Sequence, residues 1–84
     1  MVEGMSPSPT ARDKTTPQTL LRQVRREAGL SQVSLATRLG RPQPFVSKYE
    51  TGERRLDILE LREVCLALEV DLHDFVQRLE ERLL

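Results

Sequence analysis

Three polar residues, Gln43, Ser47 and Lys48, lie within a short segment that the sequence predicts to be helical. At about 100° per residue these three point to one side, whereas the apolar residues Phe45, Val46 and Tyr49 point to the other. The polar side carries little charge and offers both hydrogen-bond donors and acceptors. Such chemistry suits the edges of DNA bases in the major groove better than it suits an ordinary solvated helix face.

A first short helix is predicted immediately before this segment, over residues 32–39. Ser31 precedes it and can accept hydrogen bonds from its free backbone N–H groups. Gly40 follows it, where a left-handed backbone carries no Cβ penalty. The expected apolar stripe of this helix is Val33, Leu35, Ala36 and Leu39. The small side chain of Ala36 would let the two helices cross closely.

The second helix is predicted to begin near Gln43 and to end at Gly52. Pro42 and Pro44 would break a helix interior, but in a first turn they remove only N–H groups that have no intrahelical partner. The segment is therefore two helices joined by a tight turn, with the polar side of the second helix facing outward.

These residues resemble the helix-turn-helix domain of the phage Cro and CI repressor type, known as the Xre family. Ala36, Gly40 and Val46 match the small residue, the turn glycine and the apolar anchor of that motif. Residues 29–32 (GLSQ) resemble the entry to its second helix, and residues 46–52 (VSKYETG) resemble its I-S-x-W-E-x-G signature. The resemblance covers residues 19–79 and implies an all-α, compact five-helix bundle of the lambda-repressor-like type that binds double-stranded DNA.

The resemblance separates residues that would read bases from residues that would contact phosphates. Gln43 would bond adenine N6 and N7, Lys48 would donate to guanine O6 or N7, and Ser47 would reach either base type. Pro44 offers only an apolar contact, where the family often has a polar reader. The expected phosphate contacts are Gln32, Arg41, Thr51, Arg54 and Arg55. The alternative for each of these residues is ordinary solvated surface.

The first helix of the domain is expected to begin at Thr16 and Pro17 and to run to Ala28. In the resembled family, an arginine at the place of Arg25 pairs with a glutamate at the place of Glu50. Such an ion pair would join the first helix to the recognition helix, and the loss of one partner would leave a poorly solvated charge. The alternative is two exposed and independent charges.

Length and composition predict one small domain, residues 17–84, after a leader of residues 1–16 whose Ser, Pro and Thr content indicates disorder. Arg12 and Lys14 leave open the alternative that this leader contacts DNA. No run approaches the roughly 20 apolar residues that cross a bilayer, so we expect no membrane contact and a cytoplasmic location. Cys65, the single cysteine, lies on an apolar stripe and is expected to be a buried thiol.

The net charge of zero conceals an uneven distribution. Residues 1–56 hold ten Lys/Arg and five Asp/Glu, a net charge of +5, whereas residues 57–84 hold three and eight, a net charge of −5. Because the basic half contains the helix-turn-helix, one face can meet phosphates while the other is kept away from them. Opposite charges in the two halves would equally suit self-association.

Two more helices are expected after the motif. Asp57 and Glu60 form an acidic version of the capping box ahead of the first, and Asp71 should cap the second. Glu69 stands between them where the family usually has glycine. The apolar face of the first is Leu61, Val64, Cys65 and Leu68, and that of the second is Leu72, Phe75, Val76, Leu79 and Leu83. The end of the last helix, with Leu79, Leu83 and Leu84, either forms a homodimer contact or folds back on the first helix.

We therefore predict a sequence-specific, DNA-binding transcriptional regulator, expected to be a repressor and a dimer, without a cofactor. The alternative is an antitoxin-like module that binds a protein partner through its acidic C-terminal half. Enzyme chemistry is not expected, because no phosphate-binding glycine loop or cysteine cluster is present. His73 lies near Asp71 and Asp74, but Asp71 is better used as a helix cap than as a metal ligand.

Overall fold

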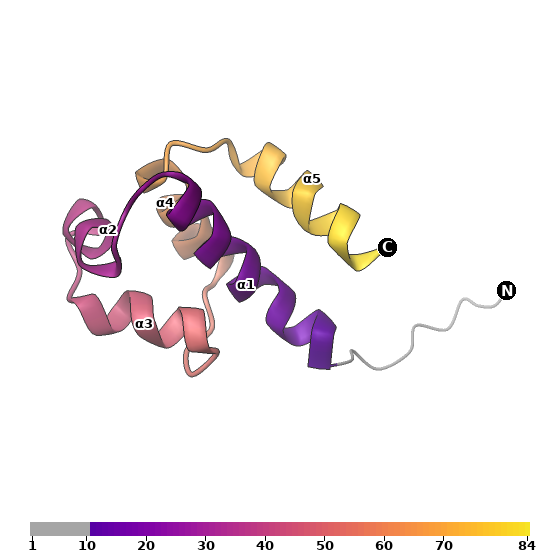
Figure 1. Cartoon of the computed structure of the whole chain (residues 1–84), viewed down its shortest axis with the longest axis horizontal. Helices are drawn as coiled ribbons and strands as arrows, with labels where there is room; N and C mark the ends of the chain where they lie inside the picture. Colours follow the sequence, from indigo (N-terminus) through magenta and orange to yellow (C-terminus); the bar gives the residue numbers. More distant parts are fainter. Residues whose placement is uncertain (1–10) are drawn as a thin grey trace, which may run out of the picture.

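Five helices make up the fold in the computed structural model, which describes residues 11–84. They are α1 (Ala11–Glu27), α2 (Gln32–Leu39), α3 (Gln43–Thr51), α4 (Ile58–Ala67) and α5 (Leu72–Leu83). Helices α1 and α5 lie side by side and run in opposite directions, whereas α2 and α3 form the other end of the molecule (Figure 1). The predicted all-α bundle is confirmed, and residues 1–10 of the predicted leader lie outside the described residues.

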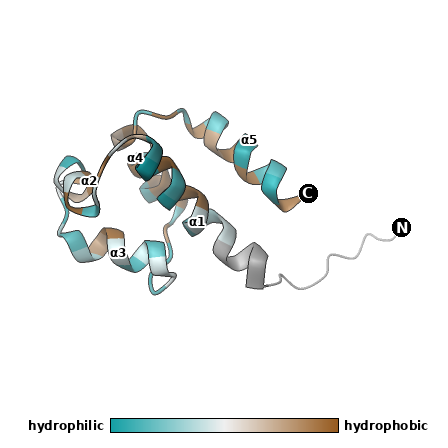
Figure 2. Cartoon of the chain, in the orientation of Figure 1, coloured by the Kyte–Doolittle hydropathy of each residue, from teal (hydrophilic) through white to brown (hydrophobic). Residues whose placement is uncertain are grey.

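Every helix contributes at least one fully buried side chain to a single core. The largest of these are Leu20, Leu35, Val46, Tyr49, Val64, Cys65 and Phe75. Burial of an aliphatic or aromatic side chain of this size stabilises the fold by roughly 1.5–3 kcal/mol. Each helix in Figure 2 alternates hydrophilic and hydrophobic colours along its ribbon, as an amphipathic helix does. The expected burial of Cys65 is confirmed, and this burial raises the pKa of its thiol to about 11.

The predicted helix ends around the motif are confirmed. The Ser31 hydroxyl accepts a hydrogen bond from the backbone N–H of Ser34 at 3.0 Å, and Gly40 ends α2 with a left-handed φ of 66°. Helix α3 begins after Pro42, with Pro44 in its first turn. These local signals set where α2 ends and α3 begins, and so keep the turn between them short.

The predicted capping box at the start of α4 is also present. The Glu60 N–H donates to the Asp57 carboxylate at 2.7 Å, and the Asp57 N–H donates back to the Glu60 carboxylate at 3.0 Å. Asp71 caps α5 by accepting from the His73 N–H at 2.7 Å. Glu69, between α4 and α5, takes the left-handed conformation that glycine usually adopts, with φ 60°.

The predicted start of α1 at Thr16 is wrong, because the helix begins at Ala11 and contains Pro17. A proline at this position removes one backbone hydrogen bond and crowds the preceding turn, yet the helix continues through it, and Thr16 beside it is buried at 7% exposed. At the other end, α1 stops at Glu27, and Ala28 is exposed rather than part of the apolar face.

Three residues of the expected apolar faces, Val33, Val76 and Leu83, are exposed. Val33 is 61% exposed. The buried side of α2 is centred between Leu35 and Ala36, and Val33 points roughly 110° away from that direction at about 100° per residue. Val76 of α5 is likewise exposed, whereas its neighbour Phe75 is buried.

Candidate nucleic-acid interface

The outward side of α3 carries the predicted base-reading residues. Gln43, Pro44 and Lys48 are exposed, and Ser47 is half-buried. The Ser47 hydroxyl donates to the Pro44 carbonyl at 3.3 Å, and the Thr51 hydroxyl donates to the Lys48 carbonyl at 3.2 Å. The structure therefore brings these five side chains together on one convex helix face. Their contacts with bases or phosphates stay predictions.

The predicted ion pair lies along one flank of this face. Arg25 of α1 donates from Nε to Glu50 Oε2 at 2.8 Å and from Nη2 to Glu50 Oε1 at 3.1 Å. Its Nη1 donates to the Leu30 carbonyl at 2.7 Å. The two side chains are only 9% and 2% exposed, and the hydrogen bonds to Glu50 raise the pKa of Arg25. The alternative of two independent surface charges is wrong.

A chain of hydrogen bonds extends this ion pair to Gln43, the first of the predicted base-reading residues. Gln32 Nε2 donates to Glu50 Oε1 at 3.0 Å, and Gln43 Nε2 donates to Gln32 Oε1 at 2.8 Å. Gln43 keeps its amide oxygen and one N–H for a partner, because an amide group offers two donors and an oxygen acceptor. The network thus orients the Gln43 amide within the folded chain itself. Gln32 uses both ends of its own amide in this network, a role that its spacing did not reveal.

The other flank of α3 carries a second cluster, around Phe45. The guanidinium carbons of Arg41 and Arg54 lie 4.3 and 4.7 Å from the centre of the Phe45 ring. Arg54 also makes two hydrogen bonds to Glu60, at 3.0 and 2.6 Å, and these lower the pKa of the Glu60 carboxyl to about 2. The parts that Phe45 and Glu60 play here were not predicted. No periodic spacing relates residues 41, 45, 54 and 60, so the sequence carried no signal for the cluster.

The two oppositely charged halves of the chain meet in ion pairs at several places. Arg38 lies 3.4 Å from Glu69, and Arg41 lies 3.8 Å from Glu60 and 3.6 Å from Glu63. The acidic half therefore neutralises part of the basic half instead of lying apart from it. Lys48 and Arg55 are exposed and make no ion pair within the described residues. These two cations are fully available to an anionic partner.

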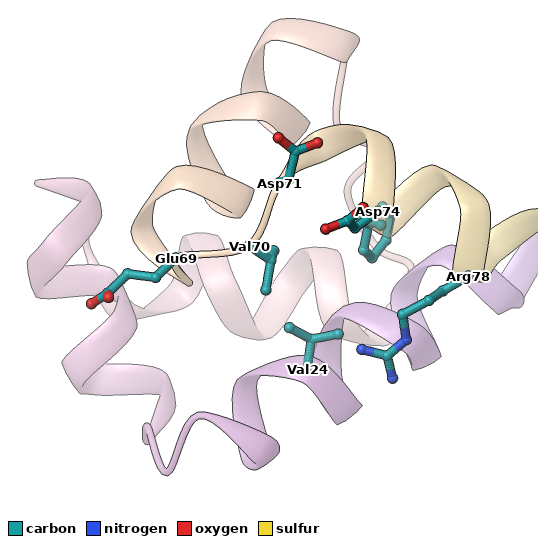
Figure 3. Close-up of a pocket in the computed structure, with 7 residues that line it drawn as sticks. Val24, Glu69, Val70, Asp71, Asp74 and Arg78 are labelled. Atoms are coloured by element: carbon teal, nitrogen blue, oxygen red, sulfur yellow. The ribbon is translucent and has the colours of Figure 1, made fainter.

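A separate pocket of about 330 Å³ opens between α1 and the start of α5. Val24 and Val70 face each other inside it, and Asp74 lies on the α5 side near Arg78, whereas the carboxylate of Asp71 points away from the two valines (Figure 3). No group of three His, Cys, Asp or Glu side chains within residues 11–84 is arranged to hold a metal ion. In the same region, no helix combines the length and the apolar character needed to cross a membrane.

Comparison with known proteins identifies the family of this chain. A helix-turn-helix family model matches residues 21–75, from α1 into α5. An XRE-family like protein from Pseudomonas syringae pv. tomato str. DC3000 is 42% identical, with a TM-score of 0.77 over 82% of this chain and 84% of that one. This chain belongs to the Xre family of helix-turn-helix proteins. The family consists of DNA-binding transcription regulators rather than enzymes, and the chain is therefore such a regulator.

More distant structures share the Xre-family fold alone. The restriction-modification controller protein C.Esp1396I has a TM-score of 0.81 and 24% identity, over 89% of this chain and 96% of that one. The clp gene regulator ClgR from C. glutamicum has a TM-score of 0.75 and 22% identity, over 93% and 97%. No curated protein sequence matches this chain. These neighbours support the five-helix fold in which α3 is exposed, and they do not indicate a DNA sequence.

Proposed function

We propose that this Xre-family regulator binds a specific duplex sequence in the cytoplasm, as a repressor, with α3 in the major groove. The observation that carries the proposal is the exposed polar side of α3, on which the Gln43 amide is already oriented by Gln32. A major groove about 12 Å wide admits one helix, and a glutamine amide matches adenine N6 and N7 in a bidentate way. Lys48, Ser47 and Pro44 complete the reading surface.

Residues on both sides of α3 would contact the DNA backbone and position the helix. Gln32 lies in the first turn of α2, where free backbone N–H groups favour a phosphate. Arg41, Thr51, Arg54 and Arg55 lie in α3 or in the turns beside it. Such contacts fix the register of the protein on the duplex but carry no sequence information themselves.

Fluorescence anisotropy on the DNA upstream of the protein's own gene, against a scrambled duplex, tests the proposal. We expect binding to one sequence to be tighter by about 10³ or more. Gln43→Ala should lose about 1–3 kcal/mol on the specific duplex, which is roughly 5- to 150-fold in affinity, and little on the scrambled one. Gln77→Ala, which removes an exposed glutamine from α5, is the matched control. Equal, weak binding of the wild type to both duplexes would contradict the proposal.

We further propose that two copies bind a two-fold operator as a homodimer through the C-terminal helix. Leu83 and Leu84 are exposed at the end of α5, and Leu84 is 94% exposed. Helix α5 also folds back on α1, where Arg78 pairs with Glu27 at 3.3 Å, and Leu79 is partly buried there.

A second exposed apolar surface lies on α4 and consists of Ile58, Leu59 and Leu66. Analytical ultracentrifugation of Leu84→Glu and Leu59→Glu variants will show which helix carries the interface, and a wild-type monomer on DNA would contradict the dimer.

The second candidate function is binding of a protein partner by the acidic half. The specific observation in its favour is the pocket in Figure 3, in which an apolar floor of Val24 and Val70 lies near the carboxylate of Asp74. A partner with a basic, partly apolar side chain would fit this combination. Copurification with the product of a neighbouring gene, lost in Asp74→Lys and retained in Gln43→Ala, would favour this function. Loss in neither variant would contradict it.

A further inference from the structure

Arg41 and Arg54 come from different turns but meet beside the same aromatic ring. Arg41 lies before α3 and Arg54 lies after it, yet both guanidinium carbons are within 4.7 Å of the centre of the Phe45 ring. Both also approach the same carboxylate oxygen, Glu60 Oε2, at 3.8 Å from Arg41 and 2.6 Å from Arg54. The ring and the shared carboxylate each interact favourably with both cations and offset part of their mutual repulsion.

Both guanidinium groups keep donors for a further anion. The side chains of Arg41 and Arg54 are 34% and 37% exposed, whereas that of Glu60 is 15% exposed. A guanidinium group has five N–H donors, and Arg54 uses some of them on Glu60 and on the Arg55 carbonyl. Arg41 lies 3.6 Å or more from its carboxylate neighbours and makes no hydrogen bond to them. Glu60 is largely buried between the two arginines, and the exposed Glu63, 3.6 Å from Arg41, forms only a solvent-screened ion pair that a phosphate could replace.

The position of the cluster suits the backbone of one DNA strand. Phe45 and Glu50 are five residues apart, so they point about 140° apart around α3. The Gln32–Glu50 network therefore occupies one flank of the reading face, and the two arginines occupy the other. A helix in the major groove has a phosphate backbone on each flank, because the groove is bounded by both strands.

We propose that Arg41 and Arg54 bind one backbone phosphate together, as a single site that Phe45 and Glu60 hold in place. The inference rests on the proposed DNA binding and deepens it, because it assigns two separate candidate contacts to one phosphate. Glu60 is a positioning residue in this site. It fixes Arg54 through two hydrogen bonds while its own backbone and carboxylate complete the cap of α4. A planar guanidinium fork on a phosphate gives both geometry and charge.

The number of phosphates is read from the salt dependence of binding. Each phosphate that is neutralised contributes about 0.9 to the slope of log K against log salt concentration. We expect Arg41→Ala and Arg54→Ala each to change the slope little, since the remaining arginine still neutralises the phosphate. In the double variant the slope should be shallower than in the wild type by about 0.9 per bound protomer. As a control, Arg62→Ala with Arg82→Ala removes an equal number of positive charges from α4 and α5 and should leave the slope unchanged.

Other results would overturn the inference. A loss of about 1.8 per protomer in the double variant would mean two separate phosphates, and an unchanged slope would mean none. Phosphate ethylation interference gives an independent reading, because the double variant should lose one phosphate per half-site. If the alanine pair does not fold by circular dichroism, Arg41→Gln with Arg54→Gln repeats the test. A wild type without salt-dependent DNA binding would overturn the proposed function itself, and the inference with it.

Discussion

Two arginine–glutamate pairs flank the recognition helix, and they differ in how far water reaches them. Arg25 and Glu50 join α1 to α3 with two hydrogen bonds between nearly inaccessible side chains. Arg54 and Glu60 make the same two-bond arrangement between a turn and α4, but more than a third of Arg54 is open to solvent. The first pair is enclosed and already bonded to Leu30 and Gln32, so its role is to hold the helices and the Gln32 side chain in place. The second can exchange part of its interaction for a phosphate.

The largest expected effect is the loss of one partner from the buried pair. Arg25→Ala leaves the Glu50 carboxylate buried without a cation, and we expect the free energy of unfolding to fall by about 3 kcal/mol or more. Urea denaturation measures this change. Glu53→Gln alters an exposed carboxylate three residues further on and should have little effect. If the free energy of unfolding fell as little in Arg25→Ala as in Glu53→Gln, the buried pair would not stabilise the fold more than the exposed pair does.

Breaking the exposed pair should cost much less stability. Arg54→Ala leaves Glu60 in contact with water and with the N–H of Asp57, so neither group is left without a partner. We expect a small decrease in the midpoint of urea unfolding, well below that of Arg25→Ala. An equal decrease in both variants would show that Arg54 is held as tightly as Arg25, and would weaken the case for a phosphate site.

Lowering the pH should weaken the exposed pair, because protonation removes the charge of Glu60. The hydrogen bonds from Arg54 lower the pKa of Glu60 from 4.5 to about 2, so the unfolded chain takes up this proton at a higher pH than the folded one. The contribution of Glu60 is therefore complete above about pH 5 and is lost as the pH falls toward 2. Thermal melts between pH 6 and 2 should show a shallower decline for Glu60→Gln than for the wild type. Glu63→Gln, on the exposed side of α4, should keep the wild-type decline.

The smallest expected effect concerns a third and still more exposed pair, Arg38 with Glu69. Glu69 holds a left-handed backbone, φ 60°, and its side chain is 81% exposed, so the ion pair contributes little. Glu69→Gly should raise the free energy of unfolding by about 0.5 kcal/mol, because relief of backbone strain exceeds the added freedom of the unfolded chain. Glu69→Ala keeps the strained Cβ and should bring no gain. A gain in Glu69→Ala would point to the ion pair itself as unfavourable.

Local signals predicted most of the fold. Ser31, Gly40 and the Asp57–Glu60 box act on backbone groups within a few residues, so their effects could be read in order along the chain. The start of α1 could not be read in this way. Pro17 favours the first turn of a helix and so predicted a start there, but α1 extends back to Ala11, and Thr16 beside the proline is buried. Val33 was misplaced for a related reason, since the direction of the core around α2 is set by α3 and α4.

The candidate site also has one part that the sequence predicted and another that it did not. The sequence by itself determined the helix-turn-helix and the outward side of α3, because helical periodicity separates Gln43, Ser47 and Lys48 from Phe45, Val46 and Tyr49. It also pointed to the Arg25–Glu50 pair, through the resemblance to the Xre family. Only the tertiary structure decided that Gln32 orients Gln43 and that Arg41 and Arg54 converge on Phe45 and Glu60. These contacts join residues 4 to 19 positions apart, and most of them link different elements, so their meeting depends on how the packed core sets the helices against one another.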